Sequence, residues 1–309
     1  MRKPPITLTL YEVKITNRSL KKRTLSLKRP LILDGSMGTK LQQRGVVPDH
    51  FLWSSIANLT DPATVTRLHQ DYISAGADII TTNTFRTNPH ALRLSNYGIS
   101  EKDFVFRSVG LALNAINEKD LLVAGSNAPA EDCYQIERRI SAGELDYNHK
   151  THIELLWEAG CDIIWNETQS HWDEIKIICE FCSSNSLPFV INLYFEEGLK
   201  LLSGEPVSEA VKFIENYSPA AVGFNCIRPA AFIEYIEQYT LTEHWGSYFN
   251  CGSGAVTDKT IGCAIDPDSY AKLLEPLLIL NPSYEGSCCG SGPEHTKAIK
   301  GLFNELYRN

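Results

Sequence analysis

Short hydrophobic runs alternate with longer amphipathic stretches from residue 30 to the end of the chain. Each run is almost continuously apolar and ends in polar or glycine-rich residues, which is typical of a strand buried on both faces of a parallel sheet. The runs predict eight strands, at 30–35, 78–85, 121–127, 161–168, 188–195, 220–226, 246–252 and 283–289.

Stretches with helical periodicity fill the intervals between these runs. They predict helices at 62–75, 103–117, 150–159, 171–184, 206–217, 229–239, 267–277 and 293–306. Eight strand and helix pairs predict a single (β/α)8 barrel of the TIM type, with a doubly wound open sheet as the structural alternative. The last two strands are polar and glycine-rich, which an active site at the carboxyl ends of barrel strands would explain.

Composition is that of an ordinary globular protein. The chain has 309 residues, of which 43% are hydrophobic and 21% charged, so it belongs to neither the disordered nor the fibrous classes. No apolar run reaches the roughly 18 residues needed to cross a bilayer. We therefore expect a soluble protein that does not act at a membrane.

Charge is distributed unevenly. Residues 1–29 contain nine Lys or Arg and one acid, Glu12, so this leader carries +8 and residues 30–309 carry −16 of the net charge of −8. An acidic body argues against a nucleic-acid partner. We expect a basic leader at 1–29 and one barrel domain at 30–309. The leader is either solvated, which Pro4 and Pro5 favour, or a targeting peptide.

The nine cysteines are odd in number and lack the regular spacing of a disulfide framework. This usage is typical of a reducing compartment, and we expect a cytoplasmic protein. Six of the cysteines are predicted to be small buried apolar residues, namely Cys133, Cys161, Cys179, Cys182, Cys251 and Cys263.

The other three cysteines indicate a metal. Cys288 and Cys289 are adjacent in GSCCG, and Cys226 ends the sixth strand run. Neighbouring Cα atoms lie about 3.8 Å apart, too close for an unstrained disulfide. A closed structural zinc site takes four protein ligands. Three thiolates therefore predict zinc with one open position, provided that the barrel brings strands six and eight together.

Polar side chains end almost every predicted strand, so the barrel would direct them to one mouth. Asp34 follows the first strand, where a turn role is the alternative. Glu167 closes the fourth, where a buried carboxylate needs a partner such as a substrate ammonium. His295 begins the final helix, so a capping or packing role is favoured over metal ligation. The remaining polar residues are Asn83, Thr84, Ser126, Asn127, Asn166, Asn192, Asn225 and Asn250.

Five segments in this order resemble the homocysteine S-methyltransferase family: DGSMGTKLQQRG, GADIITTNTF, NET, GFNC and GSCCGSGPEHTKAI. The resemblance runs from about residue 30 to 306. It implies a (β/α)8 barrel and methyl transfer to the thiol of homocysteine, giving methionine. It also implies that Cys226, Cys288 and Cys289 bind Zn²⁺. The family's usual GGCCG has Ser287 here, which leaves both ligands intact.

By the same resemblance, Asp34, Gly35 and Glu167 match positions that hold the amino and carboxylate groups of homocysteine. We add Asn83, Thr84 and Ser126 to the predicted substrate site because they share the mouth. A free thiol is mostly protonated at neutral pH, and zinc coordination would supply the thiolate. No protein side chain is then needed as a further catalytic group.

The methyl donor is predicted from the resemblance as well. Folate- and cobalamin-linked relatives carry additional modules for which this chain has no length, so a small donor is implied. S-methylmethionine is the first choice and S-adenosylmethionine the second. The alternatives are a betaine-dependent enzyme, a methyltransferase for another thiol or selenol, and a non-catalytic zinc-binding barrel. The expected partners are small-molecule substrates.

Overall fold

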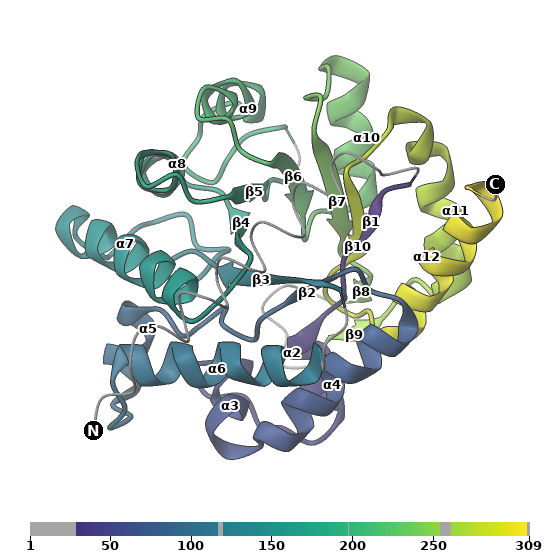
Figure 1. Cartoon of the computed structure of the whole chain (residues 1–309). Coiled ribbons are helices and arrows are strands. Elements are labelled where there is room, and N and C mark those ends of the chain that lie inside the picture. The colour runs from purple at the N-terminus through teal and green to yellow at the C-terminus, as the bar shows by residue number, and fades with distance from the viewer. Residues whose placement is uncertain (1–28, 117–119, 197, 254–260, 308–309) are drawn as a thin grey trace.

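A ring of parallel strands forms the centre of the molecule (Figure 1). The computed structural model describes residues 29–116, 120–196, 198–253 and 261–307. In these residues the strands pair in the order β1-β10-β7-β6-β5-β4-β3-β2, and a parallel bridge between Leu33 and Ile79 joins the two ends. The strands are β1 (Leu31–Ile32), β2 (Ile79–Thr81), β3 (Leu122–Asn127), β4 (Ile163–Gln169), β5 (Phe189–Leu193), β6 (Ala221–Asn225), β7 (Trp245–Phe249) and β10 (Tyr284–Ser287). The predicted (β/α)8 barrel is confirmed.

The main helices lie outside this ring and cover it (Figure 1). They are α4 (Pro62–Ala75), α6 (Glu101–Ile116), α7 (Ala142–Glu158), α8 (Trp172–Ser184), α9 (Val207–Glu215), α10 (Pro229–Gln238), α11 (Pro267–Leu274) and α12 (Pro293–Leu306). Shorter elements, absent from the sequence prediction, lie mostly in the connections that follow strands. They are α2 (Met37–Gln43), η1 (Ser54–Ile56), α3 (Ala57–Thr60), α5 (Pro89–Ser95), η2 (Glu275–Leu280) and the hairpin of β8 (Gly252–Ser253) and β9 (Gly262–Cys263).

Local signals explain which helix boundaries the sequence predicts. In α4, the Asp61 side chain accepts a hydrogen bond from the Thr64 N–H, Pro62 opens the first turn, and Gly76 ends the helix at φ 110°. The prediction of 62–75 is correct to the residue. In α7, a capping box between Ser141 and Glu144 starts the helix at Ala142, so the predicted start at residue 150 is wrong.

The barrel interior is filled by large side chains. Tyr284 stands inside the ring, where its hydroxyl donates to the Asn192 side chain and its ring packs edge-on against Trp165. A Cβ added to Gly246 would lie 2.5 Å from the Tyr284 ring, so only glycine leaves room for it. A second layer of buried side chains lies between the strands and the helices. The rigid inner core fixes the strand ends that carry the polar residues.

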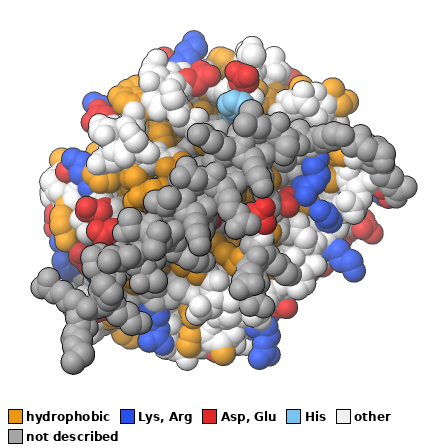
Figure 2. Space-filling view, viewed as in Figure 1, with side chains coloured by type: hydrophobic (Ala, Val, Ile, Leu, Met, Phe, Trp, Pro, Cys, Tyr) orange, Lys and Arg blue, Asp and Glu red, His pale blue; other side chains and the backbone are white. Residues whose placement is uncertain are grey.

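Figure 2 gives the surface of the face seen in Figure 1. On that face, Lys and Arg side chains of the described residues are interspersed with Asp and Glu. Among the described helices, none is both long and apolar enough to span a membrane. The predicted leader lies outside the described residues except for Arg29. The Arg29 guanidinium pairs with the Asp78 carboxylate at 2.6 Å, at the start of the barrel.

Candidate active site

Three sulfur atoms meet at the carboxyl ends of β6 and β10. The Cys226 Sγ lies 3.0 Å from the Cys288 Sγ and 3.5 Å from the Cys289 Sγ, and the last two are 3.9 Å apart. All three are free thiols. Sulfurs around one tetrahedral zinc, at Zn–S bonds of about 2.3 Å, would be separated by about 3.8 Å. The three thiols therefore fit a single metal ion.

The backbone at Cys226 turns sharply so that its thiol faces the other two. Cys226 adopts φ 57°, in the left-handed region that non-glycine residues rarely occupy. Its N–H donates to the Tyr248 carbonyl at 3.1 Å. The preceding Asn225 side chain accepts from the Thr168 N–H at 2.7 Å and donates to the Thr168 hydroxyl at 3.0 Å. These contacts over-determine the turn, as is expected where strain serves a site.

The glycine that follows the cysteine pair has a steric role. Gly290 adopts φ 82°, and a Cβ there would lie 2.6 Å from the Gly252 Cα. Its N–H donates to the Thr39 hydroxyl at 3.1 Å. The Cys288 N–H continues the strand ladder to the Phe249 carbonyl at 2.8 Å. The GSCCG run is thus held between β7 and α2.

The three thiols interact strongly with one another. Hydrogen bonds from the Cys288 and Cys289 thiols lower the pKa of Cys226 well below its usual range. The same contacts with Cys226 raise the pKa of Cys288 and of Cys289. One sulfur is thus favoured as a thiolate while its neighbours keep their protons. A divalent cation would stabilise all three as thiolates, because it replaces those protons as the positive partner.

The cysteines open onto a pocket of about 690 Å³ at this mouth of the barrel. Leu33, Asp34, Gly35, Ser126 and Glu167 line its inner end beside the cysteines. Its outer part is lined by loops that follow β1, β2 and β3. A concave site with few convergent polar groups is the usual form of a small-molecule site.

Two carboxylates share the inner end of this pocket. Asp34 is 2% exposed and accepts from the Thr81 N–H and hydroxyl, both at 2.9 Å. Burial, reinforced by the nearby charge of Glu167, raises the pKa of Asp34 well above its usual value. Burial likewise raises the pKa of Glu167 to about 7, although the Ser126 hydroxyl donates to it. A bound cation would relieve the cost of both charges.

The other predicted substrate residues divide into two groups. Gly35 and Ser126 line the pocket, and a Cβ on Gly35 would lie 2.9 Å from the Ser291 Oγ. Asn83 also lines it, but its amide is engaged with the Ser54 carbonyl at 3.1 Å and the Asn58 side chain at 3.0 Å.

Thr84 is placed differently from the other predicted residues. It is fully buried and is not among the lining residues of the pocket. Its hydroxyl donates to the Ser126 carbonyl at 2.8 Å. The structure therefore makes Thr84 a support for Ser126 instead of bringing it to the substrate.

Several lining residues have no counterpart in the sequence prediction. The Tyr134 hydroxyl lies 3.2 Å from the Cys226 Sγ, and Tyr248 reaches the pocket from β7. Trp53 lines the outer part and packs edge-on against Phe85 at 5.7 Å. Tyr134 lies between strands, so periodicity gave no signal for it. Its place beside Cys133 in a polar loop was the only available hint.

Two expectations about other residues have clear outcomes. The His295 Nδ1 accepts from the Gly292 N–H at 3.2 Å and its Nε2 lies 2.9 Å from the Ile265 carbonyl oxygen, so the packing role is confirmed. Cys133, Cys161, Cys179, Cys182 and Cys251 are buried as predicted, whereas Cys263 is exposed. It lies on the short strand β9, which forms a hairpin with β8 that the periodicity does not reveal.

The homocysteine S-methyltransferase family model matches residues 31–303. Among curated proteins, the Escherichia coli (strain K12) homocysteine S-methyltransferase is 28% identical, covering 87% of this chain and 94% of its own length. The Brassica oleracea var. italica selenocysteine Se-methyltransferase is 27% identical, with 87% of each chain covered.

A solved structure is similar over nearly the whole chain. It is the metallated form of the homocysteine methyltransferase MmuM from Escherichia coli, with a TM-score of 0.76 and 25% identity. The match covers 91% of this chain and 99% of that one.

Proposed function

The chain belongs to the homocysteine S-methyltransferase family, whose reaction is the methylation of homocysteine, and we propose that it uses zinc and a small sulfonium donor. The zinc would be bound by Cys226, Cys288 and Cys289. The observation that carries the proposal is the convergence of three sulfurs, 3.0 to 3.9 Å apart, on a pocket that is also lined by the carboxylates of Asp34 and Glu167. The metallated form of the MmuM relative supports the metal.

Bound zinc would lower the pKa of the homocysteine thiol, so that the sulfur reacts as a thiolate at neutral pH. The chain's own residues hold the remainder of the substrate. Asp34 and Glu167 would bind its ammonium group, since Asp34 is buried, Glu167 is half-buried, and both carboxylates are stabilised by a cationic partner. A side chain at position 35 would collide with Ser291, so Gly35 presents only its backbone to the pocket. Backbone N–H groups there would donate to the carboxylate of homocysteine.

The donor would enter from the outer part of the pocket. Trp53 lines that part, Tyr134 lines the pocket beside Cys226, and both rings can face the positive sulfur of a sulfonium. Glu131 and Asp132 line it too and add negative charge. Holding both substrates in one pocket aligns the methyl group with the thiolate. This alignment supplies a large part of the rate acceleration in a displacement of this kind. We propose S-methylmethionine as the first donor and S-adenosylmethionine as the second.

Other aromatic residues near the site are placed differently, and Trp165 donates through its indole N–H to the Tyr248 hydroxyl at 3.1 Å inside the barrel. Tyr194 packs against Tyr134 and donates to Glu196. Neither lines the pocket. Phe85 does, but the Arg86 guanidinium already lies 5.5 Å from its ring.

We also propose the setting of the reaction. The substrates would be small molecules, and the cysteine usage is suited to the cytoplasm. The division into a leader at 1–29 and a barrel domain at 30–309 is part of this proposal, and residues 1–28 lie outside the described part of the chain. A second acceptor is suggested by the selenocysteine Se-methyltransferase relative, since a selenol could occupy the same metal position.

The donor is tested by assaying zinc-loaded protein with homocysteine and each of S-methylmethionine, S-adenosylmethionine and betaine in parallel. Methionine should form fastest with S-methylmethionine, more slowly with S-adenosylmethionine, and not with betaine. A preference for betaine would overturn the donor assignment. Competition between homocysteine and selenocysteine would decide the acceptor.

Replacing Cys289 tests the metal. Cys289→Ala should lose zinc and methionine formation together, because two thiolates hold the ion much less tightly than three. Zinc content is measured on the purified protein, and Cys161→Ala, a buried cysteine away from the pocket, is the matched control. Full activity in metal-free protein contradicts the proposal. A metal environment that stays unchanged when homocysteine is added would favour a non-catalytic barrel.

A further inference from the structure

Residues 128–140 form a segment between β3 and α7 that covers one side of the pocket. Tyr134, near its middle, places its hydroxyl 3.2 Å from the Cys226 Sγ. Cys133 beside it is 7% exposed. The residues of this segment that line the pocket are Ala130, Glu131, Asp132, Cys133, Tyr134, Gln135, Arg139 and Ile140. Whatever holds the 128–140 segment therefore also determines the shape of the pocket.

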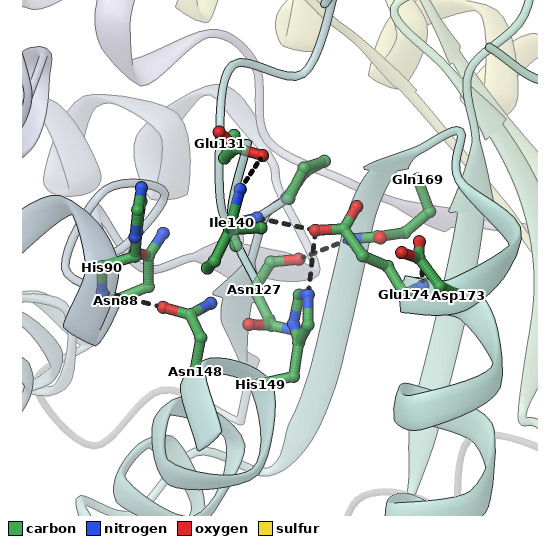
Figure 3. Close-up of polar contacts among 12 residues, drawn as sticks. Asn88, His90, Asn127, Glu131, Ile140, Asn148, His149, Gln169, Asp173 and Glu174 are labelled. Carbon is green, nitrogen blue, oxygen red and sulfur yellow. Dashed lines mark hydrogen bonds and ion pairs between the residues drawn. The ribbon is translucent and has the colours of Figure 1, made fainter. Parts of the chain in front are cut away.

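Glu174, in the first turn of α8, holds both ends of this segment. Its side chain is fully buried. Its Oε1 accepts from the Ala130 N–H at 2.8 Å, from the Arg138 Nη1 at 3.0 Å and from the His149 Nε2 at 3.1 Å. Figure 3 shows His149 of α7 and Glu174 of α8 pointing toward one another. Ala130 and Arg138 stand near opposite ends of the 128–140 segment, so a single carboxylate joins them.

The charges of this cluster are balanced inside the protein. Burial alone would raise the pKa of Glu174, but the His149 hydrogen bond and the Arg138 guanidinium hold it well below its usual range. The Asn127 Nδ2 lies 3.3 Å from the His149 Nδ1, and because an amide nitrogen can only donate, this ring atom accepts. The His149 Nε2 donates to the Glu174 carboxylate, and the Arg138 guanidinium places a positive charge beside it.

Further contacts fix the conformation within the segment. The Glu131 carboxylate accepts from the Arg139 N–H at 2.9 Å and from the Ile140 N–H at 3.1 Å, and Figure 3 shows the contact with Ile140. The Arg86 guanidinium donates to the Glu131 carbonyl at 2.5 Å. The His171 ring lies 3.1 Å from the Ile136 carbonyl oxygen. The segment is thus held as a closed loop whose base rests on Glu174.

We propose that Glu174 is a positioning residue for methyl transfer: it fixes the 128–140 segment so that Tyr134 stays against Cys226 and the donor side of the pocket keeps its shape. Glu174 touches no lining atom of the inner substrate end, so its effect is transmitted through Ala130 and Arg138. The proposal rests on the methyl-transfer function given above. It assigns the effect to the donor, because the donor is proposed above to bind on the side of the pocket that this segment lines.

Glu174→Gln tests this with little change of shape. The amide oxygen can still accept from Ala130 and His149, but the negative charge opposite Arg138 is lost. The KM for the methyl donor should rise by about tenfold, while the KM for homocysteine stays within about twofold. The reason is that misplaced residues of the 128–140 segment affect the reactant that they contact. Zinc content should be unchanged. Glu180→Gln, an exposed position on the same helix, is the matched control and should leave all of these values unchanged.

A second readout does not depend on activity. Hydrogen exchange in the peptide covering 128–140 should accelerate by at least about tenfold in Glu174→Gln, since the Ala130 N–H loses a charged acceptor. Exchange in strands β5 and β6 should not change. Arg138→Lys, which keeps the charge at a partly exposed site, should restore most of the protection lost in Arg138→Ala. These measurements remain valid if the donor assignment itself fails.

A double-mutant cycle decides whether Tyr134 transmits the effect. Tyr134→Phe removes the hydroxyl next to Cys226 and leaves the Glu174 contacts in place. If Glu174 acts through Tyr134, the double variant should lose little more donor kcat/KM than either single variant. Losses that multiply would overturn the proposal. So would a Glu174→Gln protein that raises both KM values equally or releases its zinc, because either result indicates general loosening of the barrel.

Discussion

At the scale of single residues, the site depends on groups that are costly to bury. Asp34 and Glu167 both have raised pKa values because they are withdrawn from water, and the nearby charge of Glu167 adds to the effect at Asp34. Neither forms an ion pair with a Lys, Arg or His of the described residues. Buried carboxylates without a cation are unfavourable, and a substrate ammonium would supply that cation. Under the proposed function, this energetic cost in the free pocket would favour substrates that carry an ammonium group.

The pKa of about 7 at Glu167 leads to a pH prediction. Below pH 7 this carboxyl is mostly protonated in the free enzyme and attracts an ammonium less strongly. Glu167→Gln should therefore raise the KM for homocysteine by about tenfold at pH 8, and by progressively less as the pH falls toward 6. The measurement is the ratio of the two KM values across this range. A ratio that does not change with pH would remove Glu167 from ammonium binding.

At the scale of elements, the ends of a helix are set by local sequence signals, whereas its buried face is set by packing against the rest of the fold. Asp61, Pro62 and Gly76 define α4 at both ends. The same helix buries His69, whose two ring nitrogens have no hydrogen-bond partner among the described residues. Burial lowers the pKa of His69 to about 4. This helix therefore carries a group that opposes folding in acid.

Replacing His69 should reveal that cost. The unfolded chain binds a proton at His69 below pH 6.5, whereas the folded chain resists it until about pH 4, so stability is lost as the pH falls through this window. Between pH 7 and 5 this amounts to about 2 kcal/mol. Urea unfolding at both pH values should show that His69→Leu loses less stability on acidification, by about that amount. An equal loss in both proteins would mean that His69 is protonated in the fold.

At the scale of the whole molecule, the order of the strands in the barrel creates the cluster of three sulfurs. Cys226 lies 62 and 63 residues from the cysteine pair, and β7 stands between their strands. The ring order places the ends of β6 and β10 within reach of one ion. A metal bound here would join the two strand ends, so its binding energy would add to the stability of the barrel.

Removal of the metal should consequently destabilise the whole fold. At a metal concentration a thousand times the dissociation constant, binding contributes about 4 kcal/mol, which corresponds to at least about 5 °C in the melting temperature. Calorimetry before and after chelation measures this shift. Cys289→Ala should melt at the same temperature with and without chelator. A wild-type protein that is insensitive to chelation would show that the sulfurs hold no stabilising ion.

The sequence by itself determined the eight strands, most of the helices and the three metal-ligand candidates, because each depends on local signals: apolar runs, helical periodicity and thiol chemistry. Only the tertiary structure decided which polar residues meet. Thr84 donates to the Ser126 carbonyl and does not line the pocket, and Cys263 is exposed. The Tyr134 hydroxyl contacts Cys226 from a loop that Glu174 holds. The physical reason is that side-chain partners across a barrel are set by strand order and by loop conformation, and residue spacing encodes neither.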